Sequence, residues 1–106
     1  MSDPVAWLDG RDPRAPAMLR DVMAELLEGT APSDPLPDRF AAAALAALEA
    51  AVRQPSQRRT APILLAGDAL LTYACEAAVE AGLDELERIT TELDLDRFSR
   101  LLPGTP

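Results

Sequence analysis

The chain has 106 residues, which is the usual length of one domain and too short for two separate hydrophobic cores. It carries 18 acidic and 10 basic residues, a formal net charge of -8, so its surface repels the phosphate backbone of nucleic acids. One cysteine and no histidine exclude an intrachain disulfide and the usual protein sites for zinc, iron or copper.

The N-terminal third of the chain predicts two helices. Asp3 and Pro4 supply a cap and a first-turn proline for one or two turns. Residues 16–28 give a clearer amphipathic pattern, because apolar side chains recur there at helical spacing and charged residues fill the opposite face. Three prolines within residues 30–37 predict an extended connection rather than helix or strand.

A long helix is expected over residues 38–54, ended by Pro55. Its larger apolar side chains form one stripe, consisting of Phe40, Leu45, Leu48 and Val52. Small side chains form a second, smooth face, consisting of Ala42, Ala43, Ala46 and Ala50. A row of alanines lets another helix approach closely, so these four residues are the candidate interaction face, and a homodimer through them is favoured.

The next helix is expected over about residues 62–81 and is apolar nearly all round, which predicts a buried helix at the centre of the bundle. Asp68 and Glu76 interrupt its apolar run and are costly at a bilayer centre, so no membrane span is expected. Asp84 is expected to cap a further helix. A last short helix is expected after Asp94 or Asp96 and contains three large apolar residues, Phe98, Leu101 and Leu102.

No segment alternates apolar and polar residues as strands do. We therefore expect an all-α fold, with residues 1–106 forming one compact bundle of four to five helices and residues 103–106 a short flexible tail. The opening residues lack the features of a signal peptide, and a single cysteine gives no reason to expect an oxidising compartment, so we expect a cytoplasmic protein.

Residues suited to catalysis are scarce. Cys75 has no histidine to act as its base, so it is expected to be a buried small apolar residue rather than a nucleophile. One candidate polar cluster lies at four-residue spacing on the helix expected at 62–81, and consists of Asp68, Thr72, Glu76 and Glu80. Facing inward, these groups suit a hard cation or proton chemistry; facing outward, they form a solvated edge, which is the favoured interpretation. We expect no enzyme, metal or cofactor.

Gly67 lies inside the same helix, where glycine costs about 1 kcal/mol relative to alanine, so close approach of another helix is expected there. The segment from Leu65 to Glu76, LAGDALLTYACE, resembles one helix of the trans-isoprenyl diphosphate synthases. In that all-helical family this helix packs around the prenyl chain, and two Asp-rich motifs bind magnesium diphosphate. This sequence has neither motif, so the resemblance assigns no catalytic or metal-binding residue.

Apolar helix faces and an acidic surface without catalytic groups favour a protein-interaction or regulatory module. The expected partner is another protein or a second copy of the chain, with no nucleic acid and no membrane. The alternative is a helical protein that binds a small ligand, or a catalytically degenerate relative of the isoprenoid synthases.

Overall fold

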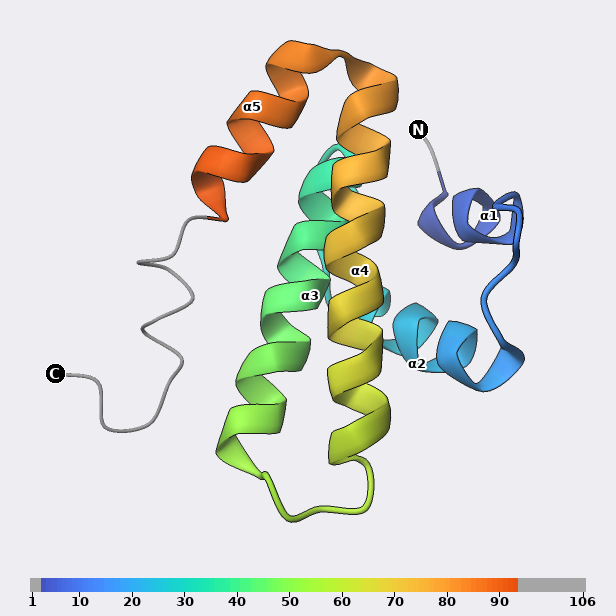
Figure 1. Cartoon of the computed structure of the whole chain (residues 1–106), viewed down its shortest axis with the longest axis vertical. Coiled ribbons are helices and arrows are strands. Elements are labelled where there is room, and N and C mark those ends of the chain that lie inside the picture. The colour runs from blue at the N-terminus through green and yellow to red at the C-terminus, as the bar shows by residue number, and fades with distance from the viewer. Residues whose placement is uncertain (1–2, 94–106) are drawn as a thin grey trace, which may run out of the picture.

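Five α-helices account for most of the residues that the computed structural model describes, 3–93, and that range contains no strand. They are α1 (Pro4–Asp9), α2 (Ala17–Glu28), α3 (Leu36–Arg53), α4 (Thr60–Ala81) and α5 (Leu83–Glu92) (Figure 1). The radius of gyration is 13.6 Å, close to the value of about 13 Å for a compact chain of roughly 100 residues. The predicted all-α bundle of four to five helices is confirmed. The short helix expected around Phe98 and the tail at 103–106 lie outside the described residues.

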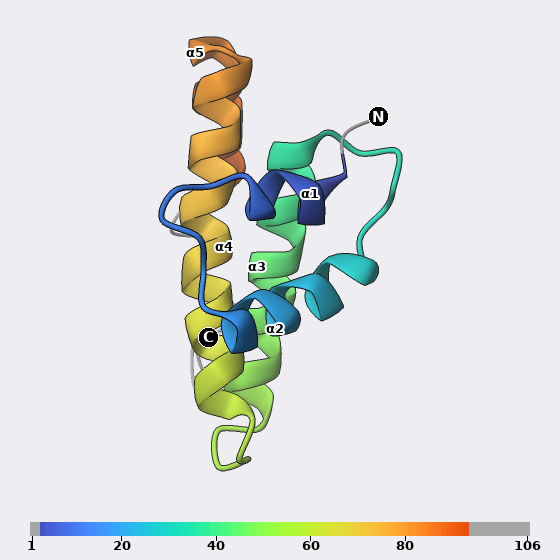
Figure 2. The ribbon, with the colours of Figure 1, turned by 90° about the vertical axis from the view of Figure 1, so that its right-hand side faces the viewer.

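The helices form three layers. α3 and α4 lie side by side and antiparallel, α1 and α2 cover one face of the pair, and α5 packs on another side near the end of α4 (Figures 1 and 2). α4 contacts α2, α3 and α5, which agrees with the central position predicted for it. The predicted packing of α2 and α3 against α4 is also confirmed.

Two predicted helix starts are wrong. α3 begins at Leu36, within the segment expected to be extended, because prolines at the cap and the second helical position cost no hydrogen bond in the first turn. α5 begins at Leu83 after Gly82, whose φ of 128° suits glycine and turns the chain sharply. Asp84 therefore lies in the first turn of α5 and is not its cap, although its carboxylate is favourable there beside the positive end of the helix dipole.

The core contains few large side chains and many alanines. Its largest fully buried residues are Phe40, Met23, Leu27, Leu70 and Ile89. Phe40 lies beside the rings of Trp7 and Tyr73, with ring centroids 5.1 Å and 6.4 Å away. The aromatic cluster therefore joins α1, α3 and α4 at one end of the bundle.

An ion pair holds α5 against the start of α3. The two terminal guanidinium nitrogens of Arg88, Nη1 and Nη2, donate to the two carboxylate oxygens of Asp38 at 2.8 Å, and Arg88 also donates to Glu85. These hydrogen bonds, first that with Asp38, raise the pKa of Arg88 above its ordinary value. A bidentate pair of this kind fixes orientation as well as distance.

Candidate docking surface

One side of α4 packs against the other helices, and the opposite side is exposed to solvent. On the packed side its small residues allow α3 to approach closely, and a Cβ added to Gly67 would lie 3.1 Å from the Cβ of Ala47. The same Cβ would lie 3.5 Å from the carbonyl oxygen of Ala44. The predicted reason for a glycine here, the close approach of another helix, is confirmed.

The prediction that α4 is a buried helix holds for only one side of it. Only 33% of its most apolar 18-residue window is buried. By length and composition α4 could also cross a membrane, a test that the core helix of a folded domain passes as well. The other side is exposed because α2, α3 and α5 cover only part of the circumference of α4, and a single helix sequence does not say how many neighbours it has.

Large apolar side chains are exposed near both ends of the uncovered side of α4, and polar side chains lie between them. Leu64 is 49% exposed, Leu65 is 63% exposed and Val79 is 52% exposed. We define the outer seam of α4 as the six residues that follow one another at alternating spacings of four and three, namely Ala61, Leu65, Asp68, Thr72, Cys75 and Val79. This alternation is the spacing with which one helix packs along another in a coiled coil.

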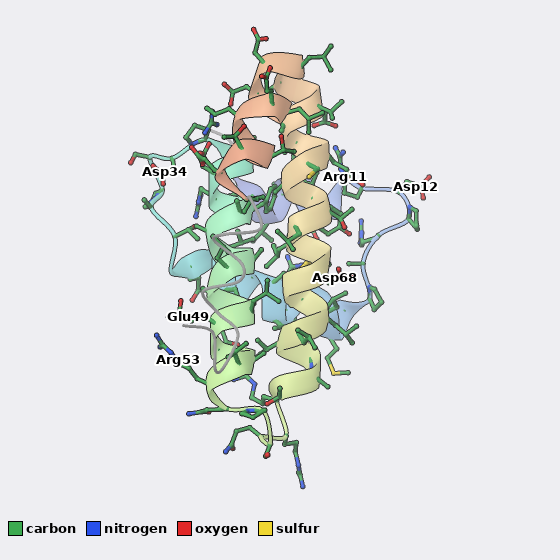
Figure 3. All side chains as sticks on the ribbon, turned by 60° about the vertical axis from the view of Figure 1, so that its left-hand side comes forward. Arg11, Asp12, Asp34, Glu49, Arg53 and Asp68 are labelled. Carbon is green, nitrogen blue, oxygen red and sulfur yellow. The ribbon has the colours of Figure 1, made fainter. Side chains whose placement is uncertain are left out.

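An open groove runs beside the first half of the seam, between α3 and α4. It encloses about 580 Å³ and is lined by Leu48, Ala61, Leu64, Leu65, Asp68 and Leu71. Asp68 is the one charged group in this lining; Figure 3 shows Asp68 on α4, and Glu49 and Arg53 together on α3. Seam and groove together form a surface on which apolar side chains predominate.

The candidate interaction face on α3 does not lie on one side of the helix. Ala42, Ala46 and Ala50 are exposed, whereas Ala43 is fully buried in the core. The alanines that pack against the rest of the bundle are instead Ala41, Ala43, Ala44, Ala47 and Ala51. Four-residue spacing keeps the three exposed alanines in one row, and the offset of one residue turns Ala43 by about 100° away from Ala42.

The four residues of the candidate polar cluster are all exposed, and the Thr72 hydroxyl donates to the carbonyl of Asp68 at 3.3 Å. Their placement agrees with the interpretation as a solvated edge. Within residues 3–93 no three histidine, cysteine or acidic side chains come close enough to hold a metal ion. Cys75 is partly buried and is a free thiol.

Glu80 has a structural role that its spacing in the sequence does not indicate. One carboxylate oxygen accepts from the indole nitrogen of Trp7 at 2.9 Å, and the other accepts from Arg11 at 2.8 Å. The guanidinium of Arg11 also lies 3.8 Å above the Trp7 ring. The hydrogen bonds from Arg11 and then Trp7 lower the pKa of Glu80 below its ordinary value. Glu80 therefore ties α1 and its following loop to the end of α4.

A second hollow, of about 530 Å³, lies between that loop and α4, on the side where Figure 3 shows Arg11 and Asp12. Its polar lining mixes one cation with two carboxylates, those of Asp12 and Glu76, and with the side chains of Thr72 and Tyr73. The Arg11 Nε atom is buried and has no hydrogen-bond partner among the described residues. The mixed charges favour no single class of ligand. Sequence reasoning missed this hollow because its lining comes from two distant segments.

Comparison of the chain with protein-family models, with curated proteins and with solved structures finds no match.

Proposed function

We propose that this protein is an interaction module that binds an apolar helix of a protein partner along the outer seam of α4. The observation that supports the proposal is the exposure of Leu64, Leu65 and Val79 on one side of a single helix. Isolated exposed leucines are common on protein surfaces, but Leu64 and Leu65 border a groove whose lining is apolar apart from Asp68, and an apolar surface of this kind is typical of a docking site.

Energetics favour a protein helix as the ligand. Burying a fully exposed leucine or valine side chain contributes about 1.5 to 3 kcal/mol. Leu64, Leu65 and Val79 are about half exposed, so together they contribute roughly 2.5 to 5 kcal/mol toward the entropy lost on association. The seam spacing suits a helix that crosses α4 at a shallow angle, because side chains of the partner then enter the gaps between seam residues. No step of this proposal requires catalysis.

A photoreactive amino acid at Leu65 tests the proposal in living cells. Illumination should give covalent adducts with a protein when the probe replaces Leu65, and none when it replaces Met18. Met18 is the matched control, because it is a large apolar residue on α2 and is 72% exposed. Adding Val79→Glu on the same seam should abolish the adducts. Equal adducts at both positions, or none at Leu65, would refute a docking role for the seam.

An apolar chain ligand is the second candidate, favoured by the groove that leucines line beside the seam. A prenyl alcohol should then raise the melting temperature of the protein progressively as its concentration exceeds the dissociation constant. Magnesium and diphosphate should add nothing, because the sequence has no Asp-rich motif to bind them. An unchanged melting temperature over a wide range of prenyl alcohol concentrations would exclude this candidate.

A further inference from the structure

We propose that the helix bound along the outer seam is α4 of a second copy of this chain, antiparallel to the first. The inference rests on the proposed docking role of the seam and adds the identity and the direction of the partner. It is based on the order of residues along the seam, on the placement of the seam's one charged group, and on the charges at the two ends of α4.

The seam is complementary to itself when it is reversed. A two-fold axis midway between Asp68 and Thr72 pairs every seam residue with another seam residue, since a residue that contacts a second one in such a dimer is contacted by it in return. Ala61 then faces Val79 of the second copy, and Leu65 faces Cys75. Each outer pair combines a larger side chain with a smaller one, so that the two helices can approach evenly along their length.

The polar residues at the middle of the seam also favour the reversed direction. Asp68 faces Thr72 of the second copy on both sides of the axis. The Thr72 hydroxyl, which donates weakly at 3.3 Å to the Asp68 carbonyl of its own helix, can turn and donate its one hydrogen to that carboxylate instead. A parallel arrangement would instead place two Asp68 carboxylates against each other, and like charges at close range oppose binding. Polar groups within an apolar seam are known to fix the register of paired helices.

The charges at the two ends of α4 are opposite in sign. The loop before α4 carries Arg58 and Arg59. Arg59 pairs with Glu25 of its own chain at 3.0 Å, and Arg58 forms no ion pair within the described residues. The end of α4 and the first half of α5 carry Glu80, which pairs with Arg11 of its own chain, and Asp84 and Glu87, which form no ion pair within the described residues. Antiparallel pairing brings the basic end of each copy beside the acidic end of the other, which counteracts the repulsion between two chains that each carry a net charge of -8.

Sedimentation equilibrium tests the partner. We expect the wild-type protein to dimerise at micromolar concentration and Leu65→Glu to raise the dissociation constant at least about 100-fold, because both copies lose an apolar contact and bury a charge. Since Leu65 is 63% exposed in the single chain, the variant should keep its helical circular dichroism spectrum. Met18→Glu is the control and should leave the dissociation constant unchanged. A monomeric wild type, or a dissociation constant that Leu65→Glu leaves unchanged, would overturn the inference.

Disulfide formation tests the direction. In the antiparallel register the two Cys75 residues are ten positions apart, or about 15 Å along the helix axis, so the oxidised wild type should form no covalent dimer. Leu65→Cys should form one with Cys75 of the second copy, and Leu65→Cys combined with Cys75→Ala should not. A covalent dimer of the wild type, or of the double variant, would show a parallel arrangement and refute this direction.

The two proposals fail in different ways. If the purified chain is monomeric while the probe at Leu65 still forms adducts with a different protein, the second copy is the wrong partner and the docking role stands. If no adduct forms at Leu65, both proposals fail together.

Discussion

The contact between Gly67 and Ala47 sets how closely α3 and α4 pack, and Gly67→Ala perturbs it by a single methyl group. Alanine in place of a glycine inside a helix should stabilise the protein by about 1 kcal/mol. The new Cβ, however, would lie 3.1 Å from the Cβ of Ala47, whereas two carbon atoms attract best at about 3.5 to 4.0 Å. Overpacking a core costs about 1 to 3 kcal/mol. We therefore expect a net destabilisation of about 1 kcal/mol.

A double-mutant cycle measured by urea denaturation separates the two effects. Ala47→Gly removes the facing methyl group, so adding Gly67→Ala in that background should show the favourable helix propensity without the clash. The coupling free energy between the two substitutions should then be about 1 to 2 kcal/mol. If Gly67→Ala stabilises the wild type by the full propensity gain, and the coupling is near zero, α3 and α4 do not pack as closely as described and the reasoning fails.

Two further predictions concern the core and the link between α1 and α4. Leu70→Ala should lower the free energy of unfolding by about 2 to 5 kcal/mol, whereas Leu83→Ala at an exposed position should change it by less than about 0.5 kcal/mol; equal effects in urea denaturation would contradict the assigned burial. Hydrogen bonds from Arg11 and then from Trp7 lower the pKa of Glu80 in the folded state. The stability that Glu80 contributes to the fold is therefore complete above its ordinary pKa of 4.5, and it is lost as the pH falls below 4.5 and through the lowered pKa. Trp7 is the single tryptophan, and its fluorescence should change over that acidic range in the wild type but not in Glu80→Gln; an identical titration in both proteins would refute the link.

Local sequence signals identified most of the helices but not all of their ends. The apolar periodicity of α2 and the cap at Asp3, whose side chain accepts from Val5, are encoded within a few residues and agree with the structure. The start of α3 at Leu36 was missed because prolines usually indicate extended chain. In α3 the prolines occupy the cap and the first turn, where the backbone N–H groups have no partner within the helix.

The candidate site was only partly predictable. The solvated edge on α4 and the close approach at Gly67 were both expected from spacing and helix propensity. The separation of Ala43 from the three exposed alanines depends on how α3 is rotated about its axis. That rotation is set by larger residues such as Phe40, which is fully buried beside Trp7.

The sequence by itself determined that the chain forms helices, because apolar spacing, caps and breakers act over a few residues. It also determined that α4 has apolar side chains around most of its circumference. Only the tertiary structure decided which of those side chains are covered. Burial depends on which neighbouring helices reach each side of α4, and those contacts, like the link from Glu80 to Trp7, join residues far apart in the chain.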